Sequence, residues 1–401
     1  MSLSDMKRIL LIATLLVIGV SSASAAPKSV PVQLGSIYSA PIGTELFLQS
    51  GKNSIFISNP NSSTLDIQIT AVDISGNQSW QRVIDSGADE VAMSATIDPL
   101  GNIWIAGGSA PVSAIESSTP ISGIENPDSV VIESIDEIRS DLSNIGLWKI
   151  SSTGELLGTF TYQSKVIPLI NSISSTNSGL ILAGSLESKA FILSATSSGI
   201  FGKPIYIGNG RSEINTVIRN SDGSATLFGS SAEKLAGKNL AGLRDGFLMK
   251  ISKSGKITSI VRSSANRASR SWISGDSANL LSGPVITGKS IETAITKFNS
   301  SFLPTWTLRI PSTGVSTTLT ANGNSYLAIT SRSPITGIAG WRPVQPALLV
   351  ITFDKKGVIK AATALPGLVR PISLHYSKER GVVGLAGSSD GTVSIFTLVS
   401  R

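Results

Sequence analysis

Three features of the sequence predict an all-β fold, a seven-bladed β-propeller of four-stranded antiparallel blades. Glycine turns recur at a nearly constant spacing, short apolar strands lie between them, and no stretch has a convincing helical period. The chain has 401 residues, more than the roughly 250 to 300 at which one compact core stops growing. That length favours repeats that add small cores side by side.

The repeat is clearest in Ile67–Ser109, which has turns at Gly76 and Gly101. Less regular units begin at Asp245 and Ile295. Each unit offers about four strands in about 45 residues, which is the size of one propeller blade. The same pair of turns recurs at Gly154 and Gly179, at Gly199 and Gly223, and at Gly357 and Gly381.

The two ends of the chain predict how the ring closes. Gly391–Ser400 looks like a first strand with no successor, and Ser36–Ser58 lacks a first strand. We therefore expect the N- and C-terminal strands to share one blade, which removes exposed sheet edges. The alternative is an open pair of β-sandwiches with frayed ends.

The N-terminus has the three-part pattern of a secretory signal peptide. Lys7 and Arg8 precede the apolar run Ile9–Val20, and small residues follow up to Ala25. The run is shorter than the roughly 20 residues of a membrane span, which is the rival interpretation. We expect a signal peptide over residues 1–25, a single propeller domain over 26–401, and a secreted or extracytoplasmic location in the cell envelope.

Composition limits the chemistry. The chain has no Cys, so disulfides, thiolate metal sites and a cysteine nucleophile are excluded. The net charge of +7 can attract anionic polymers, but it is modest for a nucleic-acid binder, and export also argues against that partner. We expect no nucleic acid partner, no cofactor, and no membrane span once the signal peptide is removed.

Two motifs resemble a known repeat. Asp245–Ile251 followed by Gly255 resembles the opening strand of the bacterial exported SBBP-type β-propeller repeat family. Asp98–Gly107 resembles the later turn and strand of the same repeat. The fifth unit departs from the pattern, because Ser301 and Phe302 replace the expected turn glycine. The resemblance implies a propeller in an extracellular or envelope setting, and it supplies no shared catalytic residues.

His375 is the only histidine. It therefore cannot contribute to a cluster of histidine metal ligands, and any Ser-His-Asp triad would have to use it. Alternation along Ile372, Leu374 and Tyr376 places His375 on the opposite strand face from those three. We expect a structural or surface role rather than catalysis.

Two recurring sets of residues have both a functional and a structural interpretation. Turn carboxylates could ligate calcium, but their positions coincide with turn chemistry, which we favour. Tryptophans could stack on sugars, but two of them share a position after the first turn, which favours packing between blades. The carboxylates are Asp73, Asp98, Asp222 and Asp354, and the tryptophans are Trp80, Trp148, Trp272 and Trp306.

Two charged segments are candidate binding surfaces. Residues 110–145 form an acidic insertion between blades, which is either a lid or partner-binding segment or, by default, a solvated and partly helical excursion. The fourth unit has a basic sector from Lys234 to Arg270, whose default interpretation is solvated charge. The candidate ligand-binding residues are Arg262, Arg267, Arg270, Lys250 and Lys253 in the basic sector, and Glu133, Asp136 and Glu137 in the insertion.

The favoured function is a non-enzymatic secreted scaffold at the cell envelope. Its expected partners are anionic envelope polysaccharide, another envelope protein, or the acidic insertion of a second copy. The alternative is an extracellular lyase or hydrolase that acts on sugars or lactones with a metal site in the central channel. That enzyme would need carboxylates converging from several blades.

Overall fold

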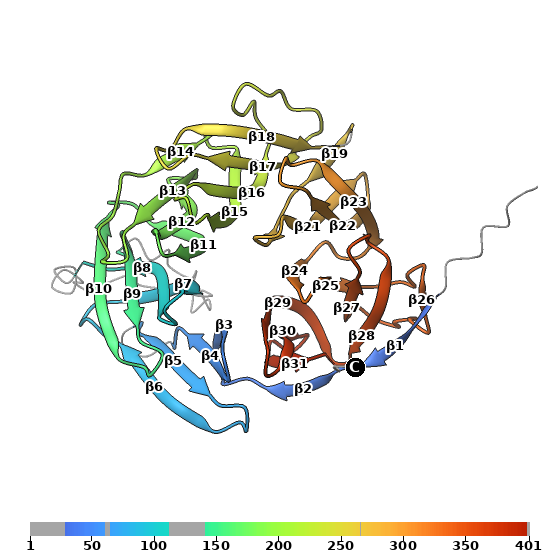
Figure 1. Ribbon diagram of the computed structural model, residues 1–401, viewed down its shortest axis with the longest axis horizontal. Helices are drawn as coiled ribbons and strands as arrows, with labels where there is room; N and C mark the ends of the chain where they lie inside the picture. The colour runs from blue at the N-terminus through green and yellow to red at the C-terminus, as the bar shows by residue number, and fades with distance from the viewer. Residues whose placement is uncertain (1–28, 61–64, 112–140, 265, 399–401) are drawn as a thin grey trace, which may run out of the picture.

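The strands of the computed structural model form a ring of sheets (Figure 1). The structure describes residues 29–60, 65–111, 141–264 and 266–398. Every regular element in these ranges is a β-strand, so the all-β prediction is confirmed. Within the same ranges there is no helix of the length and apolar character that a membrane crossing requires.

Among the described residues, six sheets are antiparallel propeller blades: five have four strands, and the sixth has the same width with its innermost strand broken in two. Blade 1 contains β3 (Thr44–Ser50), β4 (Asn53–Ser58), β5 (Ile67–Val72) and β6 (Gln78–Ile84). Blade 2 contains β7 (Glu90–Ile97), β8 (Ile103–Ser109), β9 (Asn144–Ile150) and β10 (Leu156–Gln163). Blade 3 contains β11 (Pro168–Thr176), β12 (Gly179–Leu186), β13 (Lys189–Ala195) and β14 (Ile205–Ile207).

Blades 4 and 5 continue the ring. Blade 4 contains β15 (Ser212–Arg219), β16 (Ala225–Ser231), β17 (Asp245–Ile251) and β18 (Ile257–Ser263). Blade 5 contains β19 (Ala268–Arg270), β20 (Ser274–Gly275), β21 (Leu280–Thr287), β22 (Ser290–Phe298) and β23 (Pro304–Pro311). Its innermost strand is broken, so β19 and β20 both pair with β21.

The sixth blade, which we name the closing blade, joins the two ends of the chain. It contains β29 (Leu368–Ser377), β30 (Gly381–Ser388), β31 (Val393–Thr397) and β2 (Ser36–Ser39). The N-terminal strand β2 pairs antiparallel with the C-terminal strand β31. This pairing links the first and last parts of the described chain.

The prediction of seven four-stranded antiparallel blades is wrong, because only six sheets are of this kind. The remaining sheet, which we name the mixed sheet, has six strands: β24 (Ser316–Ala321), β25 (Asn324–Ser331), β26 (Ile338–Ala339), β27 (Ala347–Phe353), β28 (Ile359–Leu365) and β1 (Val30–Leu34). Strand β1 pairs in parallel with both β28 and β26. It lies between β28 and the edge strand β26, and the chain then crosses to the closing blade.

The frame of the predicted units also needs correction. The unit Ile67–Ser109 spans β5 to β8, so its first two strands belong to blade 1 and its last two to blade 2. The turn signals are similar at both ends of a strand, and the period does not show where the chain passes to the next sheet. The predicted unit is therefore shifted by two strands.

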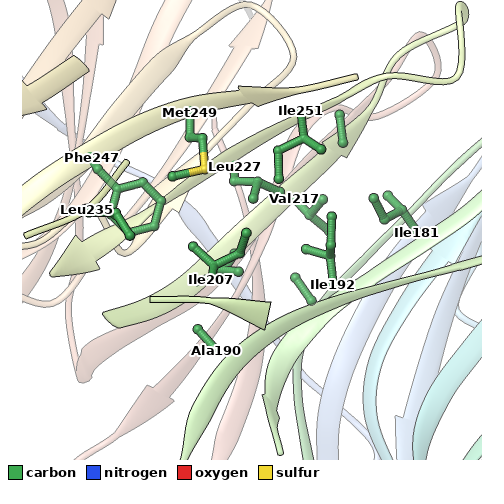
Figure 2. Packing of buried hydrophobic residues seen from close by; sticks show 13 residues of the cluster. Ile181, Ala190, Ile192, Ile207, Val217, Leu227, Leu235, Phe247, Met249 and Ile251 are labelled. Atoms are coloured by element: carbon green, nitrogen blue, oxygen red, sulfur yellow. The ribbon is translucent and has the colours of Figure 1, made fainter. Parts of the chain in front are cut away.

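Apolar clusters lie between neighbouring sheets rather than in one central core. Figure 2 shows the cluster between blades 3 and 4, where Ile181 and Ile192 face Val217, Leu227 and Met249. All five side chains are buried. Because each cluster joins only two neighbours, stability is approximately a sum of sheet and interface terms.

The innermost strands carry bulges that connect neighbouring blades. In blades 3 and 4 the register shifts at Asn171 and Asn215, and the Nδ2 groups of these residues donate to the next inner strand, at the carbonyls of Ile214 and Trp272. Each bulge brings a backbone carbonyl against a glycine of the second strand, such as Gly184, where a Cβ would clash with it. The glycines in the second-strand motif are therefore required by the bulges.

Candidate functional site

The two rims of the ring carry connections of different length. Ser172 and Ser174 on β11 accept hydrogen bonds from the N–H groups of Val217 (3.1 Å) and Arg219 (2.9 Å) on β15, so these inner strands run in the same direction. In an antiparallel blade, the connection that enters the first strand and the one between the second and third strands lie at the same end. We name this end the loop rim and the other the turn rim. The long connections 232–244 and 332–346 are both at the loop rim.

Positive charge is concentrated on one part of the loop rim. The described loop-rim connections between β10 and β28 contain nine basic residues and only two acidic ones, Glu187 and Glu233. All nine except Arg244 are exposed. We name these nine residues the basic arc: Lys165, Arg211, Lys234, Lys238, Arg244, Arg267, Lys289, Arg332 and Arg342.

The rest of the loop rim has the opposite sign. The described loop-rim connections of blades 1 and 2 and of the closing blade contain five carboxylates and no basic residue. They are Asp66, Asp85, Asp89, Asp141 and Asp390. Of the predicted acidic insertion, the candidate residues Glu133, Asp136 and Glu137 lie outside the described residues. The loop rim is therefore electrically polar across the ring.

Arg262 is engaged by the protein itself. Its Nε donates to Asp245 at 2.8 Å, and the two side chains are 7% and 0% exposed. Its terminal nitrogens donate to the carbonyls of Glu233 (2.7 Å) and Ser231 (3.1 Å). Burial raises the pKa of Asp245, but hydrogen bonds from backbone N–H groups and the charge of Arg262 outweigh it and hold this pKa below its usual value. Arg262 is thus placed to fix the base of the connection 232–244.

Glu233 fixes the other side of that connection. Its carboxylate accepts hydrogen bonds from Ser212 Oγ (2.7 Å) and from the N–H groups of Asn209 (3.0 Å) and Arg211 (3.2 Å). Burial acts to raise the pKa of Glu233, and these hydrogen bonds lower it to a net value below the usual one. The connection that carries Lys234 and Lys238 is therefore held in place rather than free.

The remaining predicted basic residues do not form one site. Arg267 is exposed at the loop rim, whereas Lys250 and Lys253 are exposed at the turn-rim end of β17. The guanidinium of Arg270 lies 4.2 Å over the ring of Trp272. Burial, together with nearby Arg309, lowers the pKa of Arg270 to about 10. Whether any of them binds a ligand stays a prediction.

A cavity of about 400 Å³ opens beside the basic arc, between blades 3 and 4. Arg211, Glu213 and Arg244 line it together with Asn171 and Ser185. Arg244 and Glu213 form an ion pair at 3.2 Å, and both side chains remain partly exposed. The cavity thus offers charges of both signs and hydroxyl groups to a polar ligand.

His375 packs between the closing blade and blade 1. Its ring meets the edge of Phe47, with centroids 5.2 Å apart, and burial lowers its pKa to about 4 despite a hydrogen bond to the Phe47 backbone. The predicted alternation is wrong in one respect, because Ile372 packs toward blade 1 while Leu374 and Tyr376 pack toward the mixed sheet. A register shift between Pro371 and Ser373 breaks the alternation.

The turn carboxylates serve their turns. Asp73 Oδ1 accepts the N–H groups of Ser75 and Asn77, at 2.8 and 2.9 Å, and Asp98 and Asp354 make the same pair of bonds. Asp222 accepts from Ser224. The turn prediction is confirmed. In the described part of the chain, no three His, Asp or Glu side chains are grouped as a metal site would require.

The tryptophans pack between sheets, as predicted. Trp148 and Trp272 are fully buried, and Trp80 and Trp306 cover turns of the following sheets. Sequence reasoning found only part of the basic arc, the members between Lys234 and Arg267, since the other members are single residues spread from Lys165 to Arg342. Only the ring brings their connections to one rim.

Comparisons with known proteins support the fold. No protein-family model and no curated protein matches the chain. The Neurospora crassa Pan2 WD40 domain is 7% identical, with a TM-score of 0.52, covering 93% of this chain and 96% of the other. A chain in the crystal structure of BBS1N in complex with ARL6DN is 10% identical, with a TM-score of 0.50, covering 93% and 98%. WD40 repeats form propellers, so this chain is similar to β-propeller proteins in its fold.

Proposed function

We propose that this chain is an exported β-propeller of the cell envelope, an interaction scaffold whose basic arc binds an acidic polysaccharide. The observation that carries the proposal is the charge of the loop rim. Its described connections between β10 and β28 contain nine basic residues and only two acidic ones. Export and an envelope setting rest on the signal-like N-terminus and on the resemblance to the SBBP-type repeat. The scaffold role is in keeping with the fold, which one neighbour, BBS1N, displays in complex with ARL6DN.

The spacing of the cations favours a polymer over a small anion. The basic arc takes its residues from the connections of several sheets, so its charges are distributed along the rim rather than converging on one point. A polyanion can contact many such cations at once, and the summed field raises its rate of association. The carboxylates on the other side of the rim repel the same polymer and so define where it lies.

Charge reversal on the loop rim tests this function. We expect Lys234→Glu, Lys238→Glu and Arg267→Glu in one variant to weaken binding to polygalacturonate by about tenfold or more at low salt, because three attractions become repulsions. The matched control reverses Lys253, Lys256 and Lys355, which are exposed at the turn rim, and should retain the affinity. Equal losses in both variants, or equal binding to neutral dextran, would contradict the proposal.

Export is tested separately. The full chain expressed in a bacterium should be recovered from the periplasm or medium with the mass of residues 26–401. Recovery of the uncut chain from the cytoplasm alone would contradict export and leave the charge measurement unaffected.

A further inference from the structure

A recurring contact joins several sheets to the next at the turn rim. The ring of Trp80 on β6 covers Gly154 in a turn of blade 2, and the ring of Trp306 on β23 covers Gly357 in a turn of the mixed sheet. A Cβ on either glycine would lie 2.7 Å from the indole. The turn glycine of one sheet is therefore the floor of a socket, and a large side chain of the preceding sheet fills it.

Other interfaces fill the same socket in different ways. Phe160 covers Gly199, and Ile205 covers Gly255. In blade 5, Phe302 stands where the other turns have glycine, and its own side chain is buried in the interface with blade 4. The closing blade has no turn between its third and fourth strands, β31 and β2, and Leu365 of the mixed sheet packs there against Gly35, in the link between β1 and β2.

The interface between the closing blade and blade 1 is different. Ser36 pairs with Thr397 as Trp80 pairs with Ala71, so Ser36 occupies the position of the tryptophan. Gly76 is the turn glycine of blade 1, and among the described residues no atom beyond its chain neighbours lies within 4 Å of where its Cβ would be. A serine side chain is too short to cover this floor.

A cavity of about 670 Å³ lies at this interface, and we name it the seam socket. Ser36 and Gly76 line it, together with Tyr38, Phe56 and Arg380. Arg380 donates to the Asp73 carbonyl at 2.6 Å, while its buried Nε has no hydrogen-bond partner among the described residues. The socket is therefore lined by aromatic side chains and by an arginine that is held at the Asp73 carbonyl.

We propose that the seam socket binds an aromatic side chain of a protein partner, seated on Gly76 as Trp80 is seated on Gly154. At the interfaces where a turn meets the preceding sheet, a large apolar side chain covers or replaces the turn glycine, and in two cases it is the indole of a tryptophan. Strand β2 is adjacent and its four residues are exposed, so an extended partner segment can align along this edge. Residues 399–401 of this chain, which follow Leu398 at the socket, are Val, Ser and Arg and contain no aromatic ring.

The first experiment titrates the full chain with N-acetyl-tryptophanamide, which presents an indole on a peptide-like backbone. We expect saturable binding with a Kd of about 1 mM, as suits a ligand of this size, with NMR shifts at Gly76 and Tyr38. Ser36→Trp should fill the socket from within, raise the melting temperature and abolish the binding. No binding to the unmodified chain, or binding that Ser36→Trp leaves unchanged, overturns the proposal.

Two further variants make the test specific. Trp80→Ser should create a matched socket over Gly154 and add a second binding site, which Ser36→Trp does not remove. Deletion of residues 399–401 should leave the affinity unchanged. If the probe bound only after this deletion, the chain's own end would be the occupant and the proposal would fail. These outcomes do not depend on polysaccharide binding, which concerns the opposite rim.

Discussion

Arg262 and Arg267 lie five positions apart in the sequence, and the structure gives them opposite surroundings. Arg262 is buried against Asp245 and donates to two backbone carbonyls, while Arg267 is exposed at the loop rim. The comparison shows that a basic segment of sequence combines two kinds of residue. One kind holds a connection in its fold, and the other is accessible to a partner.

The largest expected effect comes from removing the buried member of this comparison. Arg262→Met should lower the free energy of unfolding by about 3–5 kcal/mol, because it leaves the Asp245 carboxylate buried without its cation. Urea denaturation measures this loss. Adding Asp245→Asn should restore part of the stability by removing the charge, whereas Arg267→Met alone should change it by about 0.5 kcal/mol or less. Equal losses for the two arginines would show that Arg262 is not a clamp.

The burial of His375 should make the stability of the protein depend on pH. The pKa of His375 falls from 6.5 to about 4 on folding, so between these values the unfolded chain binds a proton that the folded chain does not. Stability should be full above pH 6.5 and fall by about 3 kcal/mol as the pH drops to about 4. His375→Phe should flatten this part of the profile in denaturant titrations at each pH. A slope unchanged by the substitution would assign the effect to other groups.

The smallest effect on stability should come from the basic arc. The loop-rim variant Lys234→Glu, Lys238→Glu, Arg267→Glu should unfold within about 1 kcal/mol of the unmodified chain, since these side chains are exposed. Its polysaccharide affinity should nevertheless fall, and the affinity of the unmodified chain should decrease steeply with salt. A salt-independent affinity would mean that the arc does not act through charge.

Local chemistry was predictable from the sequence, and assembly was less so. The turn glycines, the turn carboxylates and the packing of Trp80 and Trp306 follow from short patterns that one repeat is enough to show. The parallel addition of β1 to the mixed sheet did not follow from the sequence. Nothing in Val30–Leu34 distinguishes a strand that joins a distant sheet from one that pairs with its sequence neighbours. The bulge near Ile372 likewise changes which face a side chain takes without a local signal.

The candidate site was the hardest part to predict. Burial of Arg262 depends on Asp245, a partner 17 residues away in sequence, and on carbonyls of a long connection. The basic arc depends on residues as distant as Lys165 and Arg342, which contribute to one rim only once the ring exists. The seam socket becomes visible only when all the interfaces are compared, since a serine at position 36 is unremarkable by itself.

The pairing of β2 with β31 imposes an order of assembly on the chain. Ser36–Ser39 is made long before its partner Val393–Thr397, because more than 350 residues separate them in the sequence. Contacts between residues so distant in sequence form slowly, because a very long loop must close before the contacts can stabilise the fold. The ring can therefore close only after both strands have been made, and loss of Val393–Thr397 would release Ser36–Ser39 as well.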